Sequence, residues 1–263
     1  MRDPGKIQPA RHGALKGRGS ASYVTGRFEK SVAHAEDDGW GSLHDGATGE
    51  GGAFEVPHLD TEVREEHART VLSRNDSPDI GFSQSVNPYR GCEHGCVYCF
   101  ARPSHAYLDL SPGLDFETRL YAKTNAAERL RAELAKPSYR CSPIALGINT
   151  DAYQPIERRY RVTRSLLEVL AECRHPVSLV TKSALVVRDL DLLVPMAGQH
   201  LVTVYFSITT LDNRLASRME PRATAPHGKL RAMRQLADAG VPVGVMVAPV
   251  VPMITDRELE HIL

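Results

Sequence analysis

From residue 80 onwards, short apolar runs of strand character alternate with longer stretches of helical periodicity. Strands that are separated by helices pair in parallel, because a parallel connection needs a crossover of roughly a dozen residues. The pattern therefore predicts parallel β/α units and an α/β fold. The strand-like runs cover residues 82–89, 117–123, 144–148, 177–181, 201–208 and 243–247.

The intervening helices are predicted from apolar residues at helical spacing and from capping residues. They are expected after Asn125, over residues 188–196 and 226–239, and after the capping box formed by Thr255 and Glu258. The last of these helices has barely two turns before the sequence stops at Leu263. A C-terminal truncation of the fold is therefore expected.

Residues 1–72 differ in composition from the rest of the chain. Eleven of the twenty glycines precede residue 61; residues 1–30 hold seven Lys or Arg and two acids, whereas residues 31–60 hold seven acids and no Lys or Arg. Such a stretch buries too little apolar surface to offset its chain entropy. We expect a mostly disordered, Gly-rich leader, with a short helix over residues 62–72, followed by a barrel over residues 73–263. A basic arm that binds nucleic acid is the alternative for the leader.

Length and charge set limits on the function. With 263 residues, 42% of them apolar, the chain can form one sizeable core. Its formal net charge of zero gives no global signal for nucleic acid. No apolar run reaches the roughly eighteen residues of a membrane span, and the N-terminus lacks the apolar segment of a secretory signal. An odd number of cysteines without such a signal predicts reduced thiols in the cytoplasm, without membrane association.

The concentrated chemistry of the chain lies in one loop, where three of the five cysteines fall within eight residues. Short spacings let one loop hold an iron–sulfur cluster through thiolates. A four-iron cluster with three thiolates keeps one iron open for an outside ligand. The spacing C-x3-C-x2-C is formed by Cys92, Cys96 and Cys99.

A zinc site is the alternative for this loop. Zinc takes four ligands, so His94, Cys141 or Cys173 would have to complete the set. Structural zinc sites usually contain two paired C-x2-C knuckles, and only one pair is present. Cys173 also shares a helical stripe with Leu166 and Leu170, which predicts a core position for it. The spacing therefore favours iron–sulfur over zinc.

The cysteine spacing, with Tyr98 just before the third cysteine, resembles the signature of the radical S-adenosylmethionine (SAM) superfamily. The stretches NPYRGCEHGCVYCFARPSH, NTDAYQPIE, TKS, FSITTLD and VPVGVMVAP follow in order along residues 87–249, and together they resemble its spore photoproduct lyase-like branch, also called DNA repair photolyase-like. The resemblance implies an open partial (β/α)6 TIM-like barrel with the cysteine loop after the first strand. It also implies a 4Fe-4S cluster on the three cysteines and reductive cleavage of SAM to a 5'-deoxyadenosyl radical, which abstracts hydrogen from a substrate.

Function in β/α barrels lies at the C-terminal ends of the strands. There Lys182 would pair with the SAM carboxylate, and Ser207 matches a serine that contacts SAM in the lyase branch. The alternatives are an ordinary surface lysine and a buried serine bonded to backbone. Tyr98 is expected to stack near the cluster or the adenine, or else only to pack. Val247 and Ala248 would form an apolar wall for the adenine, or else belong to a plain buried strand.

Asn149 marks a departure from the lyase pattern. The lyases carry a cysteine there that returns a hydrogen atom to the thymine radical, and an amide has no S–H bond to donate. Cys141 precedes the third predicted strand and is expected at the opposite end of the barrel. The resemblance therefore does not extend to this hydrogen donor, and Asn149 and Asp151 are expected to hydrogen-bond SAM or the substrate instead.

Arginines gather after the third and fifth predicted strands, where clustered cations favour an anionic ligand. Interspersed acids also fit an ordinary solvated helix face. The substrate is unknown, with nucleic acid the class that the resemblance favours, and an electron donor such as flavodoxin or ferredoxin is the expected partner. Two other functions stay open: a zinc-stabilised nucleic-acid-binding module and a non-catalytic, truncated iron–sulfur protein. The arginines are Arg158, Arg159, Arg161 and Arg164 in the first group and Arg214, Arg218 and Arg222 in the second.

Overall fold

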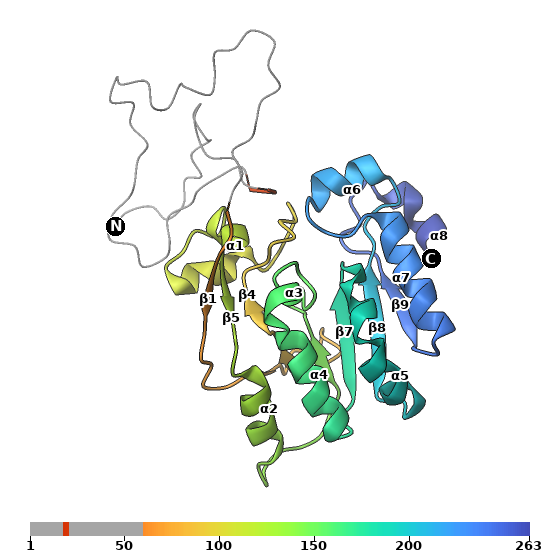
Figure 1. The fold of residues 1–263 in the computed structure, drawn as a ribbon. Helices are drawn as coiled ribbons and strands as arrows, with labels where there is room; N and C mark the ends of the chain where they lie inside the picture. The colour runs from red at the N-terminus through yellow and green to blue at the C-terminus, as the bar shows by residue number, and fades with distance from the viewer. Residues whose placement is uncertain (1–17, 21–59) are drawn as a thin grey trace, which may run out of the picture.

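The computed structural model describes residues 18–20 and 60–263 (Figure 1). The leader predicted over residues 1–72 therefore lies largely outside the described residues. The described chain forms a six-stranded sheet of order β2-β3-β6-β7-β8-β9 and a three-stranded sheet of order β1-β5-β4. The ends of the larger sheet do not pair with each other, so the barrel stays open. The predicted α/β fold, an open partial barrel, is confirmed.

The larger sheet is parallel from β3 to β9, as the alternation of strands and helices predicts. Only β2, at one edge, runs antiparallel to its neighbour β3. The sheet consists of β2 (Leu72–Arg74), β3 (Gln84–Val86), β6 (Ile144–Leu146), β7 (Val177–Thr181), β8 (Val202–Ser207) and β9 (Val243–Met246).

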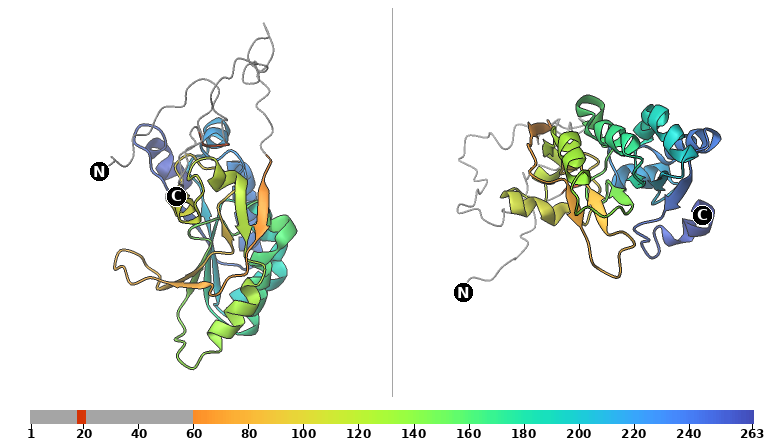
Figure 2. Two further views of the ribbon diagram at one scale, coloured as in Figure 1. Left: turned by 90° about the vertical axis from the view of Figure 1, so that its left-hand side faces the viewer. Right: turned by 90° about the horizontal axis from the view of Figure 1, so that it is seen from below.

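Helices pack along one side of this sheet (Figures 1 and 2). The longer ones are α2 (Ala126–Leu134), α4 (Val162–Glu172), α5 (Leu190–Gly198) and α7 (Pro226–Asp238). No helix in the described part of the chain is long and apolar enough to cross a membrane. Shorter segments are α1 (Asp115–Thr118), α3 (Glu157–Tyr160), α6 (Asn213–Met219) and α8 (Leu259–Ile262), with 3-10 turns η1 (Arg102–Leu108), η2 (Ala184–Asp189) and η3 (Asp256–Glu258).

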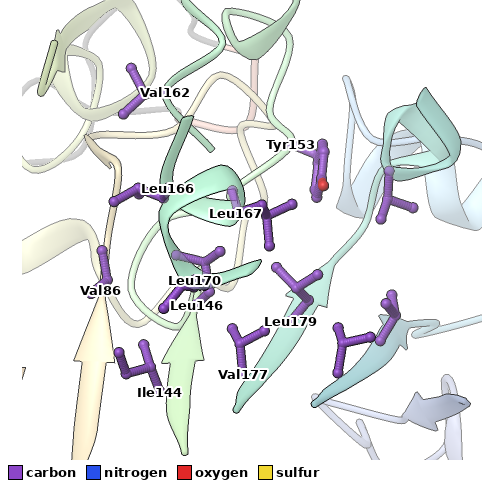
Figure 3. Packing of buried hydrophobic residues seen from close by; sticks show 14 of the residues in the cluster. Val86, Ile144, Leu146, Tyr153, Val162, Leu166, Leu167, Leu170, Val177 and Leu179 are labelled. Atoms are coloured by element: carbon purple, nitrogen blue, oxygen red, sulfur yellow. The ribbon is translucent and has the colours of Figure 1, made fainter. Parts of the chain in front are cut away.

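The core forms where α4 covers the middle of the sheet (Figure 3). Leu166 and Leu170 of α4 lie one turn apart, so both face inwards towards Leu146 of β6 and Leu179 of β7, and each of the four is at most 1% exposed. Burying one leucine side chain contributes roughly 1.5–3 kcal/mol. This interface therefore fixes β6 and β7, whose C-terminal ends carry several of the predicted site residues.

The smaller sheet overturns two predictions. Residues 117–123 were expected as a barrel strand, but β5 (Arg119–Ala122) lies in the smaller sheet, parallel to β1 (Glu62–Glu65) and antiparallel to β4 (Tyr89–Arg90). The helix expected over residues 62–72 is wrong as well, because β1 takes its backbone partners from β5.

The stretch after β1 is held by side chains of the α2 region. Asn125 accepts from the backbone N–H of Ala68 at 2.9 Å and donates to its carbonyl at 3.0 Å. The carboxylate of Glu133 accepts from the N–H of Val71 at 2.8 Å. Ala68 and Val71 are both buried in the main core. The packed part of the chain therefore begins before residue 72.

Two local predictions near helix ends are also wrong. Cys173 is exposed, because α4 ends at Glu172 and the chain leaves the helical stripe there. The capping box does not form, because the Glu258 carboxylate accepts from the backbone N–H of Leu211 at 2.6 Å, and Thr255 accepts from that of Val251 at 2.8 Å.

Candidate active site

The three cysteines lie in the loop between β4 and η1, beyond the C-terminal end of β3. Cys92 and Cys96 are buried and Cys99 is partly buried. The loop turns at Gly91 and Gly95, which have positive φ angles of 73° and 65°. Such angles favour glycine, and a Cβ on Gly95 would lie 2.7 Å from the Glu117 carboxylate. The glycines therefore let the loop wrap tightly against its surroundings.

Backbone hydrogen bonds from three directions anchor this loop. The N–H of Cys92 donates to the carbonyl of Phe116 at 2.8 Å, and that of Val97 donates to the carbonyl of Met219 at 3.0 Å. The fully buried amide of Gln154 accepts from the N–H of Glu93 at 2.9 Å and donates to the carbonyl of Gly91 at 3.0 Å. The cysteines are thus held in place by residues far along the chain.

Residues 18–20 also contact the loop, although residues 1–17 and 21–59 are outside the described residues. The N–H groups of Gly19 and Ser20 donate to the buried carboxylate of Glu117, each at 3.1 Å. Arg18 donates to the hydroxyl of Thr61 at 2.6 Å and lies 3.9 Å from Glu93. We call residues 18–20 the clasp, because they pack against the cysteine loop at Gly95.

One pocket of about 430 Å³ opens at the C-terminal ends of the parallel strands, and the three cysteines line it. Five of the six other predicted cofactor-binding residues line the same pocket. Val247 does not, because alternate residues of an extended chain face opposite sides, and its neighbours Met246 and Ala248 take the lining positions. The five lining residues are Tyr98, Asn149, Lys182, Ser207 and Ala248.

Lys182 and Ser207 come from neighbouring strand ends and meet in this pocket. The Lys182 ammonium donates to the Ser207 hydroxyl and lies 5.6 Å above the ring of Tyr98. It also lies 3.4 Å from Oε1 of Glu220. The lysine side chain is 17% exposed, so a ligand that enters the pocket can reach it.

Glu220 is a buried carboxylate at the centre of a polar network. Its Oε2 accepts from the buried Lys229 ammonium at 2.6 Å, and its Oε1 accepts from Thr209 at 2.8 Å and from the Tyr98 hydroxyl. Burial by itself raises its pKa, but the charges of Lys182 and Lys229 and these donors outweigh burial and hold the pKa at about 2. Glu220 therefore stays ionised and fixes both Lys182 and Tyr98.

Asp151 holds the end of β7 from the side of β6. It accepts from the N–H of Lys182 at 2.7 Å and from the hydroxyl of Thr181 at 2.8 Å, and His94 Nδ1 lies 3.4 Å away. Burial raises its pKa, but His94 and these donors lower it to about 2. Asn149 lines the pocket two residues earlier, and its N–H donates to the Asn87 side chain at 2.8 Å.

The three cysteine thiols line one pocket, as the ligands of one iron–sulfur cluster would. Within residues 18–20 and 60–263, no three His, Cys, Asp or Glu side chains are grouped as ligands of a single metal ion. Cys141 lines a different pocket with Arg74 and Arg140, and Cys173 is exposed, so neither adds a fourth ligand. Burial raises the pKa of Cys92 well above its ordinary value and that of Cys96 to about 12, so binding a metal centre must displace their protons.

Sequence reasoning did not identify the pair of Glu220 and Lys229 as part of the site. A signal was present, because Lys229 shares a helical stripe with Ala232 and Leu236, which are both buried. A lysine on the apolar face of a helix needs a buried partner. The partner itself lies in the loop after α6 and is brought there only by the fold.

The predicted arginine groups separate in the structure. Arg158 and Arg222, one from each group, line a second pocket beside the first. Arg164 is instead bound by Asp189 at 2.9 Å and by Asp191 at 2.6 Å, so it serves the packing of α4 and α5. Of the seven predicted arginines, Arg158 and Arg222 thus line a pocket beside the candidate active site, whereas Arg164 is held between two helices.

Comparison with known proteins shows the family to which the chain belongs. The model of the Radical SAM superfamily matches residues 86–263. An uncharacterized protein of Mycobacterium tuberculosis is 45% identical over 183 residues, which are 70% of this chain and 54% of that protein. An uncharacterized protein of Methanocaldococcus jannaschii is 26% identical over 178 residues, 68% of this chain and 64% of that protein. The chain thus covers less than two thirds of the length of either relative.

Solved structures of spore photoproduct lyase share the fold. The complex with dinucleoside spore photoproduct superposes with a TM-score of 0.55 at 19% identity, over 76% of this chain and 55% of that chain. A variant of the same lyase with bound AdoMet and dinucleoside spore photoproduct gives a TM-score of 0.54 at 20% identity over the same shares. At this identity the likeness concerns the fold.

Proposed function

Because the chain belongs to the radical SAM superfamily, whose cofactors are SAM and an iron–sulfur cluster, we propose that it is an enzyme that uses both in the pocket described above. The cluster in this proposal is a 4Fe-4S cluster on Cys92, Cys96 and Cys99. The observation that carries the proposal is that these cysteines and the pair of Lys182 and Ser207 line one pocket. The proposed catalytic unit is the barrel predicted over residues 73–263, together with β1 and the buried residues Ala68 and Val71 that precede it.

The cluster with SAM, when bound, supplies reductive cleavage of SAM to a 5'-deoxyadenosyl radical that abstracts hydrogen from the substrate. The residues of the chain bind and orient the reactants. Lys182 offers a cation to the SAM carboxylate, and Ser207 adds a hydroxyl beside it. Glu220, 3.4 Å from the Lys182 ammonium, holds this side chain in place. Ala248 and Pro249 offer an apolar wall, which excludes water from a ligand in the pocket.

The test is anaerobic reconstitution with iron and sulfide, reduction, and addition of SAM. Release of 5'-deoxyadenosine supports the proposal, and Cys96→Ala is expected to abolish it. Cys141→Ala is the matched control, because this cysteine lines another pocket, and it should keep iron content and product formation. No product from the cluster-loaded protein would sink the proposal, and zinc without iron would favour a zinc-stabilised module instead.

Nucleic acid is the proposed substrate class. Its support is that the structural neighbour is a lyase solved with a dinucleoside spore photoproduct and that two arginines lie beside the pocket. Asn149 has no S–H bond, and the described cysteines that line the pocket are the three proposed cluster ligands. We therefore propose radical chemistry on nucleic acid that does not follow the hydrogen-return step of the lyase. Incubating the reduced enzyme with damaged oligonucleotides, with products followed by mass spectrometry, tests this.

Flavodoxin or ferredoxin is the proposed electron donor, and the cytoplasm the proposed compartment. The five cysteines are unpaired, which fits a reducing compartment. The donor is tested by replacing chemical reductant with reduced flavodoxin or ferredoxin and measuring 5'-deoxyadenosine. No product with either protein, where chemical reductant gives product, would exclude both donors.

A further inference from the structure

A second pocket, of about 230 Å³, lies next to the candidate active site. Its lining includes Arg158 of α3, Arg222 of the loop after α6, and Ser183 at the start of η2. His94, from the cysteine loop, lines both this pocket and the first one. The two pockets are therefore neighbours that share a side-chain wall.

The lining of this second pocket is cationic. It contains two arginines and no carboxylate; the remaining residues are His94, Tyr153 and Pro155. The volume is below the range of about 300–1,000 Å³ that whole ligands occupy. A pocket of this size and charge suits an anionic group of a larger ligand rather than a complete one.

The two arginines have donors to spare. Arg222 uses Nη1 to donate to Glu93 at 2.9 Å, and its side chain is still 40% exposed. A guanidinium has five N–H donors, so a bond to Glu93 leaves others for a ligand. Among the described residues, no hydrogen bond or ion pair occupies the guanidinium of Arg158, which is exposed.

Ser183 adds a neutral donor to the same wall. Its hydroxyl oxygen accepts from the N–H of Leu185 at 3.2 Å, which leaves its O–H to donate. Two guanidinium groups and a hydroxyl match the several acceptor oxygens of a phosphate group. A single carboxylate would use fewer of these donors.

We propose that Arg158, Arg222 and Ser183 bind a phosphate group of the substrate while its reacting nucleotide lies in the first pocket. This rests on the proposed function, and with nucleic acid as the substrate the group is a backbone phosphodiester. Phosphate contacts of this kind position a strand without reading its sequence. The second pocket would thus determine which nucleotide of the nucleic-acid strand faces the three cysteines in the first pocket.

The test is fluorescence anisotropy of a labelled single-stranded oligothymidylate with the cluster-loaded protein over a range of NaCl concentrations. Arg158→Gln is expected to weaken binding about ten-fold and to reduce the slope of log affinity against log salt by about 0.7. Arg159→Gln is the matched control, because Arg159 is the next exposed residue of α3 and does not line the pocket. Arg222→Gln should act like Arg158→Gln, with iron content measured because Arg222 also contacts the cysteine loop.

Equal effects of Arg158→Gln and Arg159→Gln would overturn the site, since they would show only general charge attraction. Failure of the oligonucleotide to bind the wild-type protein would also overturn it. If thymidine monophosphate bound with the same dependence on Arg158 and the oligonucleotide did not bind, the pocket would belong to a free nucleotide. This result would contradict the proposal that it binds a phosphodiester of a nucleic-acid strand. Release of 5'-deoxyadenosine without oligonucleotide is followed in parallel; its absence counts against the proposed function, whereas the anisotropy alone decides the phosphate site.

Discussion

The ammonium of Lys182 lies 3.4 Å from the buried carboxylate of Glu220, which also binds the buried ammonium of Lys229 at 2.6 Å. The Glu220 carboxylate thus forms ion pairs with two lysines that differ in solvent exposure. Lys229 is 1% exposed and points into the protein, whereas Lys182 reaches the pocket. The buried pair fixes the carboxylate, and the carboxylate positions the lysine that a ligand can reach.

Glu220→Gln should destabilise the fold by about 3–5 kcal/mol, because it leaves the buried Lys229 without a counter-charge. Urea unfolding followed by circular dichroism measures this. Glu260→Gln, an exposed position on α8, is the control for loss of a charge and should stay within about 0.5 kcal/mol of wild type. An unchanged midpoint in Glu220→Gln would contradict a structural role for the carboxylate.

Acid should lower the free energy of unfolding of the wild-type protein, because it protonates Glu220. The pKa of Glu220 falls from an ordinary value of 4.5 to about 2 on folding, so its stabilisation is complete above about 4.5 and is lost as pH falls towards 2. We expect the gap in unfolding free energy between wild type and Glu220→Gln to shrink over this window. Urea titrations at several pH values between 6 and 3 measure the gap, and a constant gap would refute this assignment.

Lys182→Met should weaken SAM binding by roughly 10–100-fold, as expected for loss of a charge-assisted hydrogen bond. Ser207→Ala should cost less, about five-fold, because a neutral donor is lost. Equilibrium dialysis with the cluster-loaded protein under anaerobic conditions measures both. Lys136→Met, an exposed lysine after α2, is the control, and SAM affinity unchanged by Lys182→Met would remove this lysine from the proposed site.

The clasp should protect the proposed metal centre. A Cβ on Gly19 would lie 1.7 Å from the carbonyl oxygen of Gly95, so Gly19→Ala must displace the clasp from the cysteine loop. We expect faster loss of iron to a chelator, followed by absorbance. Gly198→Ala is the matched control, because a Cβ there meets nothing within 4 Å. Equal rates of iron loss in both variants would show that the clasp does not protect the loop.

Much of the barrel could be predicted because β6, β7 and β8 are largely buried and rich in apolar residues. β7 and β8 match the predicted runs closely for this reason. β5 was assigned to the wrong sheet, since its buried Leu120 and Ala122 look the same in sequence as barrel residues. β1 was missed because three of its four residues are exposed and polar, and only pairing with β5, far along the chain, makes it a strand.

The residues of the candidate site also fall into two groups, those that the sequence predicts and those that it does not. The cysteine loop follows from spacing, and Lys182 and Ser207 follow from their places at strand ends, which the fold brings to one edge. Glu220 could not be placed from sequence, because its position depends on how the loop after α6 packs against the cysteine loop through Val97 and Met219. Local pattern thus identifies groups that meet a ligand, whereas groups that hold them in place depend on tertiary packing.

His94 lines both pockets, and this has a thermodynamic consequence for the proposed ligands. If filling one pocket moves this side chain, the affinity of the other pocket changes with it. Linkage requires the effect to be reciprocal: the factor by which SAM changes phosphate affinity equals the factor by which phosphate changes SAM affinity. A substrate seated in the second pocket would then regulate how firmly the enzyme holds its own cofactor.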